Sequence, residues 1–356
     1  MNWINNGKKP LLIAGPCSAE TEEQVVETAI RLKKTGKVDV LRAGIWKPRT
    51  RPGAFEGIGA KGLPWMQKAK ELTGLPVAVE VAKASHVELC LEFGIDILWI
   101  GARTTVNPFA VQEIADSLKG VDIPVLVKNP INPDLALWLG GMERLQNVGL
   151  TKLGAIHRGF SFAGEKIYRN RPQWQIAIDF KTAMPDIPMI NDPSHICGRR
   201  DLLQKVAQKA MDLNFDGLII ESHITPDTAW SDASQQITPE VYGQMIDALI
   251  IRDNDPSHLK EKTKLDRLRK EIDILDDEIM NILASRMKVA RDIGQYKKDN
   301  NMVILQTDRW KEVLQKYIDR GMQSGMAPEF ISRVIKSIHD ESIEQQEKIM
   351  SGELDS

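Results

Sequence analysis

The sequence predicts an α/β protein: a (β/α)8 barrel, or TIM barrel, followed by an all-helical domain. Eight short, apolar, β-branched runs alternate with helical patterns in the first 252 residues. Seventeen of the 18 prolines lie at or before Pro256, and only four of the 25 glycines lie beyond residue 260. Because proline and glycine mark turns, the first part should contain many short elements and the last part a few long helices.

The eight predicted strands are spaced evenly along the first part of the chain. They cover residues 11–14, 38–43, 76–81, 97–102, 124–128, 153–157, 188–192 and 217–222. Helical patterns lie between them, for example at 21–34, 108–119 and 200–213, and a last one covers 239–252. An open, doubly wound sheet allows the same alternation, but open sheets seldom contain eight even units, so we favour the barrel. Catalytic groups should then follow the strands, at the C-terminal mouth.

The domain boundaries follow from composition. We expect the barrel at residues 1–252, a polar linker with one proline at 253–263, and the helical domain at 264–356. In the last domain, apolar residues alternate at spacings of three and four, which predicts one long helix with a packing seam. The seam residues are 265, 268, 272, 275, 279, 282, 289 and 293.

Composition excludes several functional classes. The 356 residues carry a net charge of −2, which lacks the basic excess of a nucleic-acid-binding protein. No apolar run approaches the length of a membrane span, and the N-terminus has no signal-peptide pattern. Three scattered cysteines do not make a disulfide scaffold. We therefore expect a cytoplasmic protein that binds neither membranes nor nucleic acid.

Four potential metal ligands follow neighbouring strands of the predicted barrel. Cys17 follows the first strand and His195 the seventh. Glu221 ends the eighth strand, and Asp232 lies in the loop beyond it. Each has an ordinary explanation by itself, such as a small buried cysteine, a loop histidine or a capping aspartate. Together, a thiol, an imidazole and two carboxylates favour a divalent transition metal, with Cys197 as a rival ligand.

A second group of side chains at the predicted mouth is cationic. Its members are Arg42, Lys47, Arg49, Arg103, Lys128 and Arg158. One or two such charges could simply be exposed on loops, but Arg42 and Lys128 lie within strand patterns, where a charge needs a partner. Guanidinium and ammonium groups bind phosphate and carboxylate. We infer two phosphorylated substrates beside the metal.

The motifs GPCSAE, KPRT, GAR and DPSH, the lysine of strand five and the Glu/Asp pair resemble type I-beta 3-deoxy-D-arabino-heptulosonate 7-phosphate (DAHP) synthases. The resemblance covers the first domain. It implies a metal-dependent, aldol-like condensation of phosphoenolpyruvate (PEP) with erythrose 4-phosphate, the first step of the shikimate pathway. Mn²⁺ is the favoured ion, and Fe²⁺, Co²⁺ or Zn²⁺ would also fit this ligand set.

The same resemblance assigns roles to individual residues. Cys17, His195, Glu221 and Asp232 match the metal ligands. Arg42, Arg103, Lys128 and Arg158 match the PEP contacts, Lys47 lies between the substrates, and Arg49 and Thr50 match the erythrose 4-phosphate side. A related synthase, which makes 3-deoxy-D-manno-octulosonate 8-phosphate, lacks the KPRT loop, so residues 47–50 decide between the two. The stretch after Arg158, GFSFAGEKIYRNRP, departs from the family's usual form.

The seam of the long C-terminal helix is interrupted by Arg286, and a charge there needs a partner. Lys297, eleven residues on, returns to within about 20° of the same face. Arg269 lies about 100° away, so we expect it to serve such a site only across a dimer. A plain helical bundle with charges at the seam edge would show the same spacing.

This region resembles AroQ-class chorismate mutases, helical enzymes that convert chorismate to prephenate. Arg269, Arg286 and Arg309 match carboxylate-binding arginines, and Lys297 and Gln346 match the pair that binds the ether oxygen. Ser342 also fits the family spacing. Gln306 and Trp310 stand where some members carry acidic residues near the substrate hydroxyl, and Trp310 cannot accept a hydrogen bond.

The two resemblances together imply a bifunctional enzyme. We expect prephenate or chorismate, bound to the helical domain, to inhibit the barrel by feedback, and we expect a homodimer or a higher homo-oligomer. The alternative is a DAHP synthase whose helical domain is a non-catalytic sensor or dimerisation module.

Overall fold

The structure is a computed structural model that describes residues 10–47, 53, 55–252 and 262–353. The chain divides into two compact units, Met1–Asn254 and Asp255–Ser356. None of the described helices is long and apolar enough to cross a membrane.

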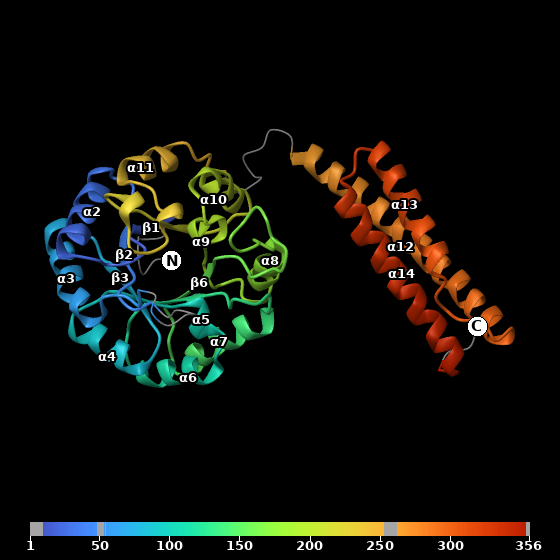
Figure 1. The fold of residues 1–356 in the computed structure, drawn as a ribbon, viewed down its shortest axis with the longest axis horizontal. Helices are drawn as coiled ribbons and strands as arrows, with labels where there is room; N and C mark the ends of the chain where they lie inside the picture. The colour runs from blue at the N-terminus through green and yellow to red at the C-terminus, as the bar shows by residue number, and fades with distance from the viewer. Residues whose placement is uncertain (1–9, 48–52, 54, 253–261, 354–356) are drawn as a thin grey trace. The chain divides into compact units, whose positions relative to one another are not determined.

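The first unit is a closed barrel of eight parallel strands surrounded by helices (Figure 1), so the predicted barrel is confirmed and the open sheet is wrong. The ring closes where β8 pairs with β1, with Leu11 opposite Gly217 and Gly15 opposite Glu221. The strands are β1 (Leu11–Gly15), β2 (Val40–Ala43), β3 (Val77–Val81), β4 (Ile97–Ile100), β5 (Val125–Lys128), β6 (Leu153–His157), β7 (Met189–Asn191) and β8 (Gly217–Glu221).

The strands are apolar because nearly all of their residues are buried. Side chains that point inward fill the barrel, among them Ile13, Trp99 and Ile219. Side chains that point outward join a second, larger cluster beneath the helices. This filled interior leaves the loops at the strand ends as the place for a site.

Eight main helices follow the strands within the described chain. They are α2 (Glu22–Lys34), α3 (Gly62–Thr73), α4 (Ala84–Glu92), α6 (Pro108–Ser117), α7 (Leu135–Asn147), α8 (Trp174–Ala183), α10 (Leu203–Asp212) and α11 (Pro239–Asp247). Short elements lie among them: α5 (Ala102–Thr105), α9 (Pro193–Cys197), η1 (Gly59–Lys61), η2 (Arg200–Leu202), η3 (Pro226–Thr228) and η4 (Ala233–Gln235).

Side-chain caps fix where several of these helices begin. Thr21 caps α2, Asn107 caps α6 and Thr238 caps α11 by accepting backbone N–H bonds. The last predicted helix, at 239–252, is too long, because α11 ends at Asp247. In the segment that follows, the backbone N–H of Ile250 instead donates to Oε1 of the Gln208 side chain, at 2.9 Å.

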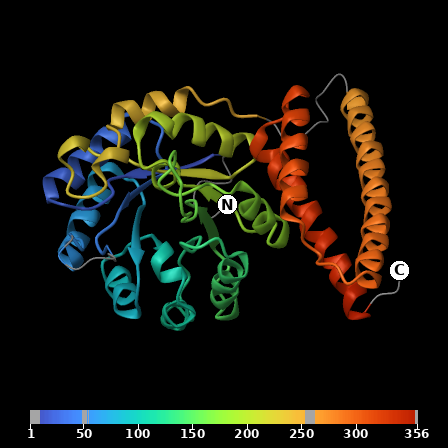
Figure 2. The same cartoon turned by 45° about the vertical axis from the view of Figure 1, so that its right-hand side comes forward.

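The second unit contains three helices, α12 (Lys262–Asp299), α13 (Thr307–Gln323) and α14 (Pro328–Ser351). Both α12 and α13 pack against α14, as the two views in Figures 1 and 2 show. The single long helix predicted from the apolar seam is confirmed. Gly294 allows close packing there, because a Cβ at this position would lie 3.0 Å from Cα of Gln346.

Candidate active site

The four predicted metal ligands lie at the C-terminal ends of barrel strands. Cys17 follows β1, and Glu221 ends the neighbouring strand β8. His195 lies in α9, which follows β7 directly, and Asp232 immediately precedes η4 in the loop after β8. Asp232 has a left-handed backbone (φ 49°), a conformation that costs free energy and is frequent at functional sites.

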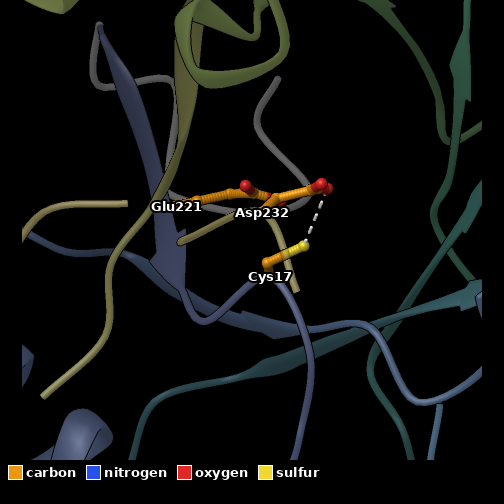
Figure 3. A group of neighbouring side chains, drawn as sticks. All are labelled: Cys17, Glu221 and Asp232. Atoms are coloured by element: carbon orange, nitrogen blue, oxygen red, sulfur yellow. Dashed lines mark hydrogen bonds between the residues drawn. The ribbon is translucent and has the colours of Figure 1, made fainter. Parts of the chain in front are cut away.

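Three of the four side chains converge closely (Figure 3). One ligand atom from each of Cys17, Glu221 and Asp232 lies within 4.8 Å of the other two. The thiol of Cys17 donates to Oδ2 of Asp232 at 3.4 Å. His195 is joined to the group through Glu221, since its Nε2 lies 3.6 Å from Oε1 of that carboxylate. Among the described residues this group contains Cys17 and not the rival Cys197.

The chemistry of these side chains fits a divalent transition ion. Such ions accept sulfur, imidazole nitrogen and carboxylate oxygen together, whereas Mg²⁺ and Ca²⁺ take oxygen ligands. The residues present are therefore a possible metal site.

The surroundings control the charge of these groups. Burial raises the pKa of Cys17 to about 12. Burial opposes ionisation of Glu221, but His195, Arg42 and Lys47 outweigh it and hold its pKa below the usual value. For Asp232, burial is likewise outweighed by Arg169 and His195, and the pKa of the carboxyl is lowered strongly. Both carboxylates are therefore ready to bind a cation.

Asp192, which the sequence reasoning missed, orients His195. Its Oδ2 lies 2.8 Å from Nδ1 of the imidazole and accepts from Nζ of Lys128 at 2.9 Å. Its Oδ1 accepts the backbone N–H of His195 at 3.0 Å. A carboxylate on Nδ1 leaves Nε2 free for an ion. Asp192 is the first residue of the DPSH motif, three positions before His195. That position beside a predicted metal ligand was the signal that could have identified it as a site residue.

The predicted cations gather beside the metal ligands. One cavity is lined by Lys47, Glu80, Gly101, Ala102, Arg103, Lys128, Arg158, Arg169, His195 and Asp232. Lys47 donates to Sγ of Cys17 at 2.8 Å, and Arg158 donates to Oδ1 of Asn170 at 2.9 Å. Burial lowers the pKa of Arg158 to about 10. A cavity with four predicted cations in its wall is suited to anionic ligands.

Three of the residues predicted to bind the substrates are not among those that line this cavity. Arg42 is buried but does not line the cavity: it donates to Glu221 at 3.2 Å and to the Cys17 carbonyl at 3.1 Å. Its place in the strand pattern is therefore explained by the carboxylate that it neutralises. Arg49 and Thr50 lie outside the described residues.

The sequence reasoning also missed Glu80, Arg169 and Gln235. Glu80 lines the cavity and accepts from Nε1 of Trp99 at 3.1 Å. A charged residue inside the apolar run of the third strand was the signal for it. Arg169 lies in the stretch that departs from the family form, and Gln235 in the loop of Asp232; neither position stands out in the sequence.

A second polar cluster lies inside the helical unit. Arg286 donates to Oγ of Ser342, and Lys297 donates to Oε1 of Gln346 at 3.1 Å. Lys297, Ser342 and Gln346 are buried. A cavity of about 380 Å³ beside them is lined by Lys297, Gln306 and five residues of α12 and the following turn. The wall of this cavity thus contains the ammonium group of Lys297, the carboxylate of Asp292 and the amide of Gln306 among apolar side chains.

The remaining residues predicted in this unit have other partners. Arg269 pairs with Asp266 at 3.8 Å, and Arg309 pairs with Glu312 at 3.2 Å, with all four side chains exposed. Trp310 stacks on His339 with ring centroids 3.9 Å apart. The ion-pair partners of Arg269 and Arg309 in the described part of the single chain are thus neighbouring carboxylates and not members of the Lys297 cluster.

Comparison with known proteins decides the family. The profile of the DAHP synthetase I family matches residues 2–257. The chain belongs to this family. A phospho-2-dehydro-3-deoxyheptonate aldolase of Thermotoga maritima is 35% identical over 235 residues, which cover 66% of this chain and 67% of that one. A 2-dehydro-3-deoxyphosphooctonate aldolase of Caulobacter vibrioides is 26% identical over 268 residues, covering 69% and 88%.

Solved structures give the same result. The crystal structure of the Thermotoga maritima DAHP synthase aligns with a TM-score of 0.61 at 32% identity and covers 68% of each chain. The chorismate mutase type II profile matches residues 268–347. The chain thus combines a DAHP synthase domain with a chorismate mutase domain, and both are enzymes of the shikimate pathway.

Proposed function

We propose that the barrel condenses PEP with erythrose 4-phosphate at the cavity described above. The observation that carries this proposal is that the candidate metal ligands and the cationic side chains lie together at the C-terminal end of the barrel. Cys17, Glu221 and Asp232 form a group that could hold a metal ion, and Lys47, directly beside Cys17, belongs to the cationic wall. A metal ion that polarises the aldehyde and fixed positive charge around the phosphates would both favour a reaction between two phosphorylated substrates.

The cations bind and orient the substrates. Arg103, Lys128 and Arg158 line the cavity and would hold the phosphate and carboxylate of PEP. Arg42 would act on these anions only indirectly, since its guanidinium is committed to Glu221. Arg49 and Thr50 remain our candidates for the erythrose 4-phosphate side.

Lys47 is our candidate acid at the aldehyde oxygen. Burial favours its neutral form, but Cys17 and Glu221 outweigh burial and raise its pKa, so the ammonium group keeps a proton to donate. Replacing Lys47 with alanine should reduce turnover by about 100-fold or more. Lys152→Ala, at an exposed ion pair on the barrel surface, is the control. Near-normal turnover of Lys47→Ala would exclude this role.

The ligand set would hold a divalent ion, with Mn²⁺ favoured and Fe²⁺, Co²⁺ or Zn²⁺ as alternatives. When bound, such an ion supplies Lewis-acid polarisation of the aldehyde carbonyl. The principal experiment measures both reactions of the purified protein with and without a chelator. Only DAHP formation should be lost on chelation and restored by added metal. Comparing erythrose 4-phosphate with arabinose 5-phosphate tests the choice of sugar.

We further propose that the helical unit converts chorismate to prephenate. The buried Lys297–Gln346 pair would stabilise negative charge developing on the ether oxygen, and Arg286 would bind a carboxylate. Lys297→Met should abolish chorismate consumption and leave DAHP synthesis intact. If the wild-type protein does not consume chorismate, the helical unit is the non-catalytic sensor or dimerisation module that we consider the alternative.

A homodimer, or a larger homo-oligomer, is supported by the exposed face of α12. The side chains of Ile272, Ile279 and Ile282 are 57%, 53% and 67% exposed in the single chain. An apolar stripe of this kind is a typical protein interface, and a second copy could also bring Arg269 to the mutase site. Ile279→Lys should yield monomers in sedimentation velocity, whereas Glu278→Lys, on the adjacent exposed position, should not.

We also propose that the helical unit controls the barrel by feedback. Prephenate or chorismate bound at the Lys297 cavity would inhibit DAHP synthesis across the linker at 253–263. Arg286→Met should then remove the inhibition by prephenate and keep the synthase rate; retained inhibition would exclude this route.

The three cysteines are free and buried, which supports a reducing, cytoplasmic location.

A further inference from the structure

The loop after β6 is attached to the helix that carries His195. The backbone N–H of Arg169 donates to the carbonyl of Cys197 at 3.3 Å, and that of Asn170 donates to the carbonyl of Ile196 at 3.1 Å. The Asn170 amide also donates to the carbonyl of His195 at 2.6 Å. This is the stretch that departs from the family form. Its backbone position is therefore fixed relative to the metal ligand on α9.

From this position the guanidinium of Arg169 reaches a second metal ligand. Its Nη1 lies 3.1 Å from Oδ1 of Asp232 and donates to Oε1 of Gln235 at 2.7 Å. Gly198 makes room for the side chain, because a Cβ there would lie 2.5 Å from Cβ of Arg169. Asp232 directs its other oxygen, Oδ2, toward Cys17. Arg169 thus leaves the ligand side of the carboxylate free.

Gln235 extends this contact to the second carboxylate. Its side chain is fully buried, and its Nε2 donates to Oε2 of Glu221 at 2.6 Å. The Oε1 atom of Glu221 faces His195 and Arg42 instead. An amide is suited to this place, since it accepts from a guanidinium at one atom and donates to a carboxylate at the other.

We propose that Arg169 and Gln235 are positioning residues of the metal site, forming a bridge from Asp232 to Glu221 that holds both carboxylates at ligand spacing before an ion binds. This inference rests on the proposed metal dependence of the barrel. The bridge contacts Oδ1 of Asp232, whose Oδ2 faces Cys17. It contacts Oε2 of Glu221, whose Oε1 faces His195 and Arg42. Hydrogen-bond partners of this kind fix ligand orientation, and their loss typically weakens metal binding by about 10- to 100-fold.

The test measures Co²⁺ binding to the chelator-treated, full-length protein by calorimetry, together with the absorption spectrum of the bound ion. Removing the charge of Arg169 would also remove its repulsion of the ion, so the variants conserve charge. Gln235→Met keeps the volume but removes both hydrogen bonds. Arg169→Lys keeps the charge on a shorter side chain. Arg171→Lys, in the same loop but paired with Glu165 at 3.6 Å, is the matched control.

We expect Gln235→Met to weaken Co²⁺ binding by about 10-fold or more and to alter the ligand-field spectrum. Arg169→Lys should weaken it by about threefold or more, and Arg171→Lys by less than about twofold. Saturating Co²⁺ should restore DAHP formation by Gln235→Met with a wild-type KM for PEP, which a direct role in PEP binding would not allow.

Two results would overturn the inference, and they differ. Wild-type affinity and spectrum in Gln235→Met, or in Arg169→Lys if the first variant does not fold, would remove the bridge but leave the metal site. Failure of the wild-type protein to bind Co²⁺ would refute the metal site itself.

Discussion

Replacing Asp192 with asparagine tests how the metal side and the anion side of the barrel mouth are coupled. The Asp192 carboxylate contacts both His195, at 2.8 Å, and Lys128, at 2.9 Å. Burial opposes its ionisation, but His195 and Lys128 outweigh burial and hold the pKa of Asp192 well below its usual value. The carboxylate is therefore charged at neutral pH, and asparagine removes that charge with little change in shape.

The expected loss of stability is large because Lys128 is buried. Breaking a buried ion pair by removing one partner costs about 3–5 kcal/mol. For a unit of this size, about 1 kcal/mol corresponds to 2–4 °C in Tm, so the melting temperature of the barrel should fall by at least about 6 °C. The imidazole also loses the charge of the carboxylate that lies 2.8 Å from its Nδ1, so metal affinity should fall by about 10- to 100-fold.

The assay is thermal unfolding of the metal-free protein followed by circular dichroism, with Asp122→Asn as the control. Asp122 also pairs with a lysine, Lys152 at 2.6 Å, but its side chain is 77% exposed. Exposed pairs contribute at most about 1 kcal/mol, so the control should melt within a few degrees of the wild type. If Asp192→Asn melts with the control, the carboxylate does not stabilise the mouth as we argue.

Three further predictions concern other parts of the chain. Burial lowers the pKa of His157 to about 4, so its contribution to stability is complete above about pH 6.5 and is lost as the pH falls toward 4. The loss should reach about 2 kcal/mol at pH 5. In urea titrations at neutral pH and at pH 5, His157→Gln should lack this part of the pH dependence, and an unchanged dependence would contradict the argument. Gly198→Ala should displace Arg169 and weaken Co²⁺ binding, whereas Gly36→Ala, also at a positive φ but with nothing within 4 Å, should not; equal affinities in calorimetry would rule this out. Trp310→Ala should lower the unfolding free energy of the helical unit by about 1 kcal/mol or more, because a stacked ring pair is lost; the same melting temperature as the wild type would show that the stack is not stabilising.

The sequence was sufficient for the barrel because a parallel strand that is buried on both faces must be almost wholly apolar. The same rule made Arg42 and Lys128 conspicuous, and both prove to have buried carboxylate partners. The end of the last barrel helix was predicted less well. Residues 248–252 continue an apolar pattern, but a contact with α10 that is distant in sequence ends the helix earlier.

The residues that orient the ligands could not be predicted in the same way. Arg169 and Gln235 are 66 positions apart, and they come within 2.7 Å because the loops after β6 and β8 meet at the same end of the barrel. Gln235 is uncharged, so nothing in a strand or helix pattern distinguishes it from a surface glutamine. In the helical unit, the apolar repeat predicted the seam of α12 but could not tell which part of it packs within one chain.

The indole of Trp99 provides an internal optical and magnetic reporter of substrate arrival. Its ring is fully enclosed in the barrel, with the guanidinium of Arg42 at 4.8 Å and the ammonium of Lys128 at 5.9 Å from the ring centroid. An anion that draws on the field of these cations must change the electronic environment of the ring. A fluorinated tryptophan at this position would therefore allow occupancy to be followed by fluorine NMR, without waiting for any product to form.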